Sequence, residues 1–235
     1  MIRKNLFLFT FLGILIISVL VVVSCIKEDY YNYNSQNDSS RNTDMEQELD
    51  TLRLTEEEIS LVMSGDTSEL MRVFLLYNFD ENGDTISTYE DSIVLRTISR
   101  DVSPDSTNDI LKHLVYRMYK TVNDPEHPGV GIAAPQVGIN RKIIWVQRQD
   151  KPNTPFEVYF NPEIFQYGSQ LLYGLEGCLS VPETSGYVKR PRSILIKYDD
   201  WGGNEHIELV ESYTARIFQH EIDHLNGILY VDIAE

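Results

Sequence analysis

The chain has 235 residues, with 36 acidic and 20 basic side chains and a formal net charge of −16 at pH 7. Such an acidic surface repels phosphate backbones, so the composition argues against a nucleic-acid partner. The chain contains only two cysteines, Cys25 and Cys178.

The first 25 residues have the pattern of an export signal. Two basic residues near the start precede an almost unbroken apolar run from residue 6 to residue 23, which is followed by Ser24 and Cys25. This order is typical of a secretory signal. The Val-Val-Ser-Cys junction resembles a bacterial lipoprotein box, which implies cleavage before Cys25 and a lipid on its sulfur. A transmembrane anchor is the alternative, because the apolar run is long enough to span a bilayer. We favour the lipoprotein because the run ends on this junction and not on basic stop-transfer residues.

This interpretation predicts a membrane-anchored lipoprotein outside the cytoplasm, on the periplasmic side or at the cell surface. Residues 1–24 are then the signal peptide. Residues 25–50 are polar and rich in Asn, Ser, Asp and Tyr, and we expect them to form a flexible tether. With Cys25 lipidated, Cys178 is the one remaining thiol. A lone cysteine in an exported protein indicates a metal ligand or a reactive thiol, unless it is simply a small buried apolar residue.

Residues 51–91 are predicted to form a small N-terminal extension made of a helix and a hairpin. Thr55 and Glu58 fit a capping box at the start of a helix, and Gly65 fits its end. The Asn-Gly pair at residues 82 and 83 is typical of a tight turn. We therefore expect a hairpin within residues 70–89.

Residues 92–235 are predicted to form one compact catalytic domain. Ser103 followed by Pro104 suits the start of a helix. Apolar residues then recur at helical spacing, at positions 110, 111, 114, 115, 118, 119 and 122. A last helix is expected to begin near Ser212 and to end at Gly227.

Short strand candidates lie between these two helices, separated by Pro, Gly or Asn residues. They are "KIIWVQ", "FEVYFNP", "SILIKYDD" and "HIELV", and the last two are joined across the turn sequence "WGGN". Strands in runs with few helices favour an α+β fold. We expect antiparallel sheets packed around the C-terminal helix.

The segment "RIFQHEIDHLNG", residues 216–227, contains an H-E-x-x-H pattern. On a helix His220 and His224 lie about 40° apart on one face, so both imidazoles can reach one ion. Glu221 points to the side of that pair, near enough to reach a water on the ion. An ordinary amphipathic helix with two incidental histidines is the alternative, because a five-residue pattern is weak evidence alone.

A third metal ligand is expected upstream of the helix. Zinc proteases with this pattern take it from farther down the chain, but the eleven residues after His224 contain no His or Cys. Only the carboxylates of Asp232 and Glu235 could serve there. Cys178 is the better candidate, because a Cys, His, His set leaves a fourth position for water.

Three motifs together resemble the peptide deformylase family. They are "GVGIAAPQ" at 129–136, "EGCLS" at 176–180 and "QHEIDH" at 219–224, all complete and in the order of that family. The resemblance covers roughly residues 90–235. It implies a deformylase-like fold and one divalent metal ion, Fe2+ or Zn2+, with Cys178, His220 and His224 as ligands.

The resemblance also implies the roles of the remaining site residues. Glu221 is expected to act as general base and acid, while the Gln136 side chain and the Leu179 backbone N–H stabilise the oxyanion. Val130 and Gly131 are expected to bind the substrate. In this chemistry the ion lowers the pKa of its bound water and supplies hydroxide, which removes the N-formyl group of formyl-methionyl peptides. Each oxyanion donor contributes roughly 3 kcal/mol in other enzymes.

Neighbouring residues are expected to support this site. Glu176 and Asp223 are more suited to orienting the histidines or Arg190 than to catalysis. Ser185 stands where family members often carry a larger or basic residue that helps to hold the substrate. We therefore expect intact chemistry with weaker affinity for peptides.

The export signal leaves two functions open. Deformylases act in the cytoplasm on new chains, which an exported protein does not meet. The first hypothesis is a membrane-tethered metal hydrolase acting on N-formyl peptides or a small formylated amide. The alternative is a non-catalytic tethered lipoprotein that binds formylated peptides on the same fold. The intact Glu221 and Gln136 favour the enzyme, and the upstream cysteine ligand argues against a zinc endopeptidase.

Overall fold

The computed structural model describes residues 52–235, and these belong to one compact unit that begins at Thr51 and ends at Glu235. The predicted signal peptide and the whole of the predicted tether, with Cys25, lie outside the described residues. None of the helices within residues 52–235 is long and apolar enough to cross a bilayer.

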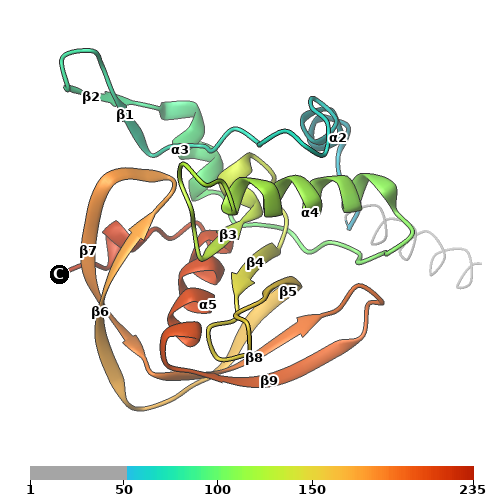
Figure 1. Ribbon diagram of the computed structural model, residues 1–235, viewed down its shortest axis with the longest axis vertical. Coiled ribbons are helices and arrows are strands. Elements are labelled where there is room, and N and C mark those ends of the chain that lie inside the picture. The colour runs from blue at the N-terminus through green and yellow to red at the C-terminus, as the bar shows by residue number, and fades with distance from the viewer. Residues whose placement is uncertain (1–51) are drawn as a thin grey trace, which may run out of the picture. The chain divides into compact units, whose positions relative to one another are not determined.

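The largest element is a five-stranded antiparallel sheet with the order β3-β4-β5-β8-β9 (Figure 1). Burial alternates along the strand β8, where Ile194 and Ile196 are buried and the residues between and beside them are less so. This alternation places one face of the sheet on a core. The strands are β3 (Gly131–Ala133), β4 (Ile143–Gln147), β5 (Phe156–Tyr167), β8 (Ser193–Asp199) and β9 (Glu205–Glu211).

The second sheet is a long hairpin of β6 (Leu171–Cys178) and β7 (Val181–Pro191). The sequence analysis identified no strands here, because Pro182, Gly186 and Pro191 have low strand propensity. The hairpin is inserted between β5 and β8, which pair directly with each other. It places Cys178 at the end of β6, where that residue pairs with Val181.

Helix α5 (Ser212–Leu225) lies between the two sheets, as Figure 1 shows. Its apolar face packs on the five-stranded sheet through Ala215, Phe218 and Leu225. The same helix also contacts β7 on the other sheet. The α+β fold with antiparallel sheets around the H-E-x-x-H helix is therefore confirmed.

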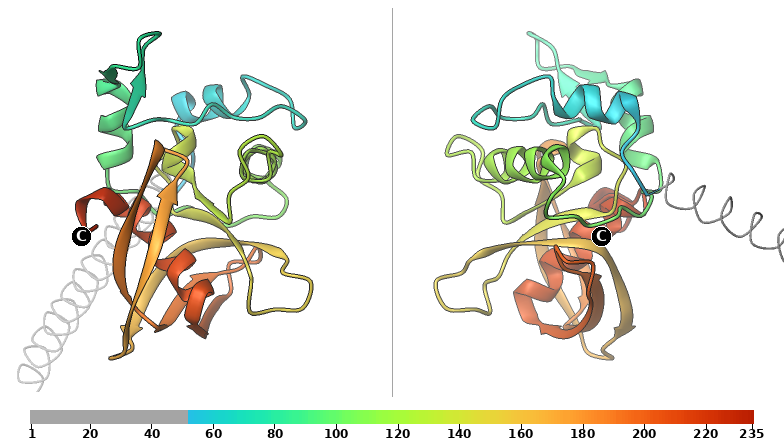
Figure 2. Two further views of the ribbon diagram at one scale, coloured as in Figure 1. Left: turned by 60° about the vertical axis from the view of Figure 1, so that its left-hand side comes forward. Right: turned by 90° about the vertical axis from the view of Figure 1, so that its right-hand side faces the viewer.

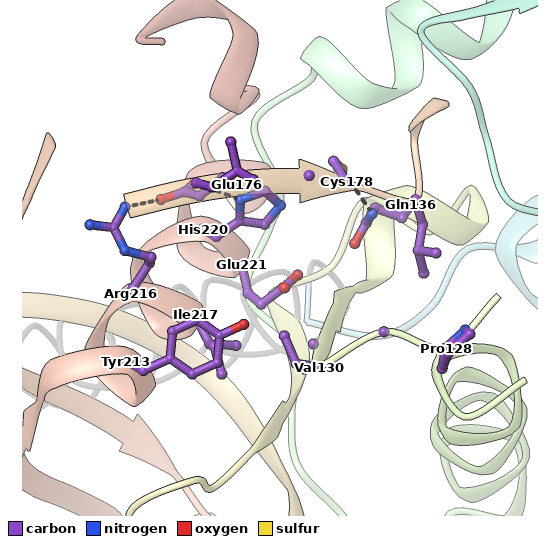
Figure 3. Close-up of a pocket in the computed structure, with 15 residues that line it drawn as sticks. Pro128, Val130, Gln136, Glu176, Cys178, Tyr213, Arg216, Ile217, His220 and Glu221 are labelled. Carbon is purple, nitrogen blue, oxygen red and sulfur yellow. Dashed lines mark hydrogen bonds and ion pairs between the residues drawn. The ribbon is translucent and has the colours of Figure 1, made fainter. Parts of the chain in front are cut away.

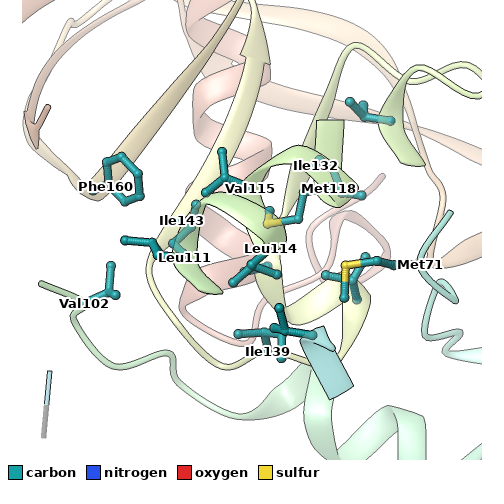
Figure 4. Close-up of a cluster of buried hydrophobic side chains, with 14 residues drawn as sticks. Met71, Val102, Leu111, Leu114, Val115, Met118, Ile132, Ile139, Ile143 and Phe160 are labelled. Atoms are coloured by element: carbon teal, nitrogen blue, oxygen red, sulfur yellow. The ribbon is translucent and has the colours of Figure 1, made fainter. Parts of the chain in front are cut away.

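Helix α4 (Asp109–Val122) covers a separate part of the core (Figure 4). Leu111, Leu114 and Met118 from the predicted apolar stripe pack there with Ile132 of β3 and Ile143 of β4. The predicted start of this helix at Ser103 and Pro104 is wrong. Its N-cap is Asn108, whose side-chain oxygen accepts the backbone N–H groups of residues 110 and 111 at 3.0 Å each.

The segment before α4 begins with α2 (Glu56–Val62), which carries the capping box between Thr55 and Glu58. Strands β1 (Tyr77–Phe79) and β2 (Thr85–Ser87) form a short hairpin, and α3 (Tyr89–Arg96) follows. In both views of Figure 2 these elements lie together on the side away from β8 and β9.

The hairpin is shorter than the expected range of 70–89. In place of strand partners, residues 71–76 bond to the loops around the site. The N–H of Phe74 donates to the carbonyl of Gln136 at 2.7 Å, and the N–H of Leu76 donates to the carbonyl of Ser180 at 2.8 Å. This segment is therefore hydrogen-bonded to two of the three sequence motifs, those at residues 129–136 and 176–180.

Candidate active site

Three side chains converge where the end of β6 meets the middle of α5. Figure 3 shows two of them, Cys178 and His220. One ligand atom from each of Cys178, His220 and His224 lies within 4.8 Å of the others. The Cys178 Sγ atom is 3.1 Å from His224 Nε2. One helical turn separates the two histidines, so both face the cysteine, as the four-residue spacing predicts.

This donor set fits a divalent transition metal. A thiolate and two imidazoles are the ligands that zinc and iron take in proteins, and three protein ligands leave a position for water. Metal ligation requires a free lone pair on each imidazole. His220 meets this requirement because its Nδ1–H donates to Glu176 Oε2 at 3.0 Å, which leaves Nε2 for the ion.

Glu176 is held by two arginine side chains. Arg190 donates to it through Nε at 2.7 Å and Nη2 at 2.9 Å, and Arg216 donates through Nη1 at 2.6 Å. Burial alone would raise the pKa of Glu176, but the hydrogen bonds from His220 and Arg190 outweigh it and hold the pKa at about 2. Arg190 also donates to Asp223 at 2.7 Å. Both acidic residues thus have the orienting contacts that the sequence indicated.

Glu221 lies in a different environment within the same cavity. It is buried, and no described residue hydrogen-bonds its Oε2 atom. Burial raises its pKa to about 7. An unpartnered buried carboxylate is costly unless a ligand or water completes it. Its position beside the ligand set therefore suits proton transfer to and from a bound molecule.

Gly131 allows Glu221 to occupy this position. A Cβ atom on Gly131 would lie 2.8 Å from Glu221 Cδ and 2.9 Å from Cγ, far inside normal carbon contact. The sequence analysis assigned Gly131 to substrate binding. The structure shows that its missing side chain also makes room for Glu221.

Gln136 and Leu179 lie on the other side of the ligand set. The Ala133 N–H donates to Gln136 Oε1 at 2.9 Å, which turns Nε2 toward Cys178 Sγ at 3.4 Å and Ser180 Oγ at 3.3 Å. The Leu179 N–H donates to no acceptor within residues 52–235. The Gln136 amide is therefore held beside the site by these contacts, and the Leu179 N–H is available there as a donor.

A cavity of about 350 Å³ contains these groups. Val130, Gly131, Gln136, Leu179 and Glu221 line it, so the structure brings together the predicted site residues that it describes. Other lining residues were not identified from the sequence; among them are Pro128, Leu175, Tyr213, Arg216 and Ile217. Arg216 could have been found, because it lies one helical turn before His220 on the same face of α5.

The sequence profile of the polypeptide deformylase family matches residues 84–235, which is more than half of the chain. The sequence is similar to that of a peptide deformylase from Leptospira biflexa, with 41% identity over 148 residues. The match covers 59% of this chain and 81% of that relative.

Solved structures agree with this match. The crystal structure of a peptide deformylase from Thermotoga maritima has a TM-score of 0.58 and 32% identity, and the match covers 71% of this chain and 99% of that one. A class I type b peptide deformylase from Acinetobacter baumannii with Met-Ala-Ser bound has a TM-score of 0.54 and 35% identity, with 69% and 99% covered. With its three motifs assembled around one cavity, this chain is a member of the peptide deformylase family and a hydrolase.

Proposed function

We propose that this protein removes the formyl group from the N-terminus of formyl-methionyl peptides. The observation that carries the proposal is the cluster of Cys178, His220 and His224 next to Glu221, whose Oε2 atom has no partner within the described residues. Cys178, His220 and Glu221 line the same cavity. This combination supplies a metal site and a proton carrier, which hydrolysis of an amide requires.

The ion and the side chains have separate tasks. Cys178, His220 and His224 would hold the ion, which when bound lowers the pKa of water and so provides a nucleophile near neutral pH. Glu221 takes the proton that the attacking water loses and returns it to the nitrogen of the departing amine. The water oxygen bonds to the formyl carbon and the carbon–nitrogen bond breaks, which gives formate and a free N-terminus.

Gln136 and Leu179 would stabilise the negative charge that develops on the formyl oxygen. The Gln136 amide is fixed by its bond from Ala133, so its Nε2 donors need little reorganisation. The Leu179 N–H has no other acceptor within the part of the chain that the structure describes. Donors placed in advance where charge develops contribute more than flexible ones, and each is worth roughly 3 kcal/mol elsewhere.

The metal is proposed to be Fe2+ or Zn2+. Thiolate and imidazole ligands accept both ions, and availability usually decides between them. If the protein works outside the cytoplasm, redox-inert zinc is the safer ion for a site that depends on a reduced thiolate.

Formate release from formyl-Met-Ala-Ser by the full chain, with metal content measured on the same sample, tests the function. The variant Glu221→Gln should keep the metal and lose at least about 100-fold in kcat. Glu126→Gln removes an exposed carboxylate and is the matched control, with unchanged turnover expected. Metal-replete protein that binds the formyl peptide without releasing formate would reject the enzymatic proposal and favour a binding role.

We also propose that the protein is anchored outside the cytoplasm through a lipid on Cys25. The support is the sequence of the first 25 residues, which lie outside the described part of the chain. The substrates would then be formylated peptides already outside the cell membrane, or a small formylated amide. Labelling with radioactive palmitate followed by fractionation tests this. Full-length, unlabelled protein in the cytoplasmic fraction would refute it and restore newly made chains as the substrate.

A further inference from the structure

One short segment before β1 bonds to both loops that carry the proposed oxyanion donors. The Phe74 N–H donates to the carbonyl of Gln136 at 2.7 Å, in the short helical turn after β3. The Leu76 N–H donates to the carbonyl of Ser180 at 2.8 Å, in the turn between β6 and β7 that also contains Leu179. The segment thus bonds to the backbone beside each donor.

The two loops are joined to each other less firmly than to this segment. Within the part of the chain that the structure describes, no backbone hydrogen bond runs directly between them. The side-chain bonds between them come from Gln136 Nε2, which donates to Cys178 Sγ at 3.4 Å and to Ser180 Oγ at 3.3 Å. That nitrogen is also the group expected to bond to the oxyanion. The link through Phe74 and Leu76 is therefore the backbone connection that remains when the Gln136 amide turns to a substrate.

The segment is itself held between these two bonds. Its middle residue, Leu75, donates its N–H to Asp91 Oδ2 at 3.0 Å and accepts the Thr88 hydroxyl at its carbonyl. Asp91 is buried, and Arg72 donates to its Oδ1 at 2.8 Å and to its Oδ2 at 2.7 Å. Each backbone N–H of residues 74–76 is thus bonded to a group outside the segment. We call residues 74–76 the strap.

The side chains at the two ends of the strap pack beside the same loops. A Cβ atom on Gly138, which ends the helical turn after β3, would lie 2.6 Å from Cε2 and Cζ of Phe74. The phenyl ring therefore lies directly on this backbone. Leu76 packs on the apolar cluster that contains Val181 and that Cys178 also contacts. Each end of the strap thus combines a backbone hydrogen bond with side-chain packing.

We propose that the strap sets the distance between the Gln136 amide and the Leu179 N–H, and that Asp91 is the positioning residue that holds the strap. This rests on the proposed function, because the spacing of the two donors matters only if an oxyanion forms between them. The strap lies before residue 84, where the match to the family profile begins, so the three motifs do not include it. Oxyanion donors act because they are placed in advance, so a looser strap raises the energy of the transition state without weakening substrate binding.

The variant Asp91→Leu tests the strap, because it removes the acceptor of the Leu75 N–H at similar side-chain size. The kcat for formyl-Met-Ala-Ser should fall about tenfold, which is less than the roughly 100-fold or greater loss on removal of one oxyanion donor. KM should stay within about twofold, because the oxyanion forms only during the reaction. Asp91→Asn keeps an acceptor oxygen and should recover most of the lost kcat.

Matched variants separate positioning from a general loss of stability. Glu90→Leu makes the same change at the adjacent exposed carboxylate and should leave kcat unaltered. Thr88→Val is nearly isosteric and removes the other bond to Leu75, so it should lower kcat by less than Asp91→Leu does. If Asp91→Leu does not fold, Thr88→Val is judged by the same measurements.

A double-mutant cycle tests whether Asp91 acts through the oxyanion donors. In the background of Gln136→Leu, the further loss of kcat caused by Asp91→Leu should be smaller than in the unmodified protein. Residues that act through a shared group are non-additive, whereas independent ones multiply their effects on the rate.

Nuclear magnetic resonance of the zinc-loaded full chain keeps the strap separable from the proposed function. With nitrogen-15 labelling, the Leu179 N–H and the Gln136 side-chain amide give signals that report on the two donors whether or not formate is released. Both signals should shift or broaden in Asp91→Leu and stay in place in Glu90→Leu.

Unmoved donor signals or an unchanged kcat in Asp91→Leu would overturn the proposal. Losses of kcat from Asp91→Leu and Gln136→Leu that multiply in full would also do so. Shifted donor signals in a protein that releases no formate would support the strap and reject the deformylase. Equal formate release by Asp91→Leu and the unmodified protein would do the reverse.

Discussion

The variant Gly131→Ala tests whether close packing of the β3 backbone holds Glu221 in place. The change adds one methyl group to a residue that has no side chain to take part in the reaction. That methyl carbon would lie 2.8 Å from Glu221 Cδ, while carbon atoms normally approach to about 3.5–4.0 Å. The Glu221 carboxylate must therefore move by roughly 1 Å, or the β3 backbone must do so.

The expected loss follows from that displacement. A misplacement of about 1 Å at a reacting group costs on the order of 100-fold in rate. Removal of a general base costs about 100- to 10,000-fold, so Gly131→Ala should approach the lower end of the Glu221→Gln effect. The added methyl group also overpacks a tight site, which costs about 1–3 kcal/mol of the free energy of unfolding.

Formate release from formyl-Met-Ala-Ser, metal content and the urea unfolding midpoint are measured on the same preparation. Ile132→Val is the control, because it perturbs the adjacent buried residue and costs about 0.5–1.5 kcal/mol without touching Glu221. It should keep nearly full turnover. Gly131→Ala with a full equivalent of metal and more than a third of the original kcat/KM would refute the packing argument.

Three further perturbations test the ligand set, the N-terminal segment and the acid response. Cys178→Ser should lose its metal at neutral pH, because a serine hydroxyl stays protonated, and a full equivalent of metal in elemental analysis would contradict the assignment. Arg117→Met should lower the free energy of unfolding in urea by about 2–4 kcal/mol, since buried Arg117 donates to the Val62 carbonyl at 2.8 Å and to two more carbonyls of the same segment. Lys120→Met on the exposed face of α4 is the control. Equal losses of unfolding free energy in the two variants would contradict the role of Arg117. The bond from Arg148 lowers the pKa of Asp150 from 3.8 to about 2. Ionised Asp150 therefore adds to the free energy of unfolding above pH 3.8, and this contribution is lost as pH falls through 2. Thermal unfolding of the unmodified protein and of Asp150→Asn should therefore differ most above pH 4 and converge near pH 2, whereas a constant difference would contradict this.

The parts of the site that could be predicted from the sequence are those set by local spacing. Two histidines four residues apart on one helix must share a face, so His220 and His224 could be paired from their spacing alone. Cys178 required more, because 42 residues separate it from His220. It was reached through the motif resemblance, not through periodicity.

Elements whose residues have conflicting local preferences were missed. The prolines and glycine of β7 disfavour a strand, yet pairing with β6 over its whole length outweighs them. The start of α4 was misplaced for a related reason. Ser103 and Asn108 are both good cap residues, and only the tertiary position of the chain decides between them.

Contacts between distant segments had no signal in the sequence. Arg148 is almost fully buried and donates to Asp150, to Tyr159 and, 60 residues away in the chain, to Glu208. A buried arginine requires such partners, because an isolated buried charge is very costly. The sequence shows only a single basic residue at the end of a predicted strand, which is ordinarily exposed.

The contacts of Glu176 and Glu221 give a physical basis for the different roles that the sequence analysis expects of these two glutamates. Glu176 receives hydrogen bonds from two arginines and from His220, so every contact favours its charged form and fixes its position. Glu221 receives no comparable bond, and its Oε2 atom has no partner within the described residues. A carboxylate that is fully engaged cannot also carry a proton between water and amine, whereas one with a free oxygen can. The contacts therefore support the proposed division of roles, in which Glu176 orients His220 as a metal ligand and Glu221 carries the proton.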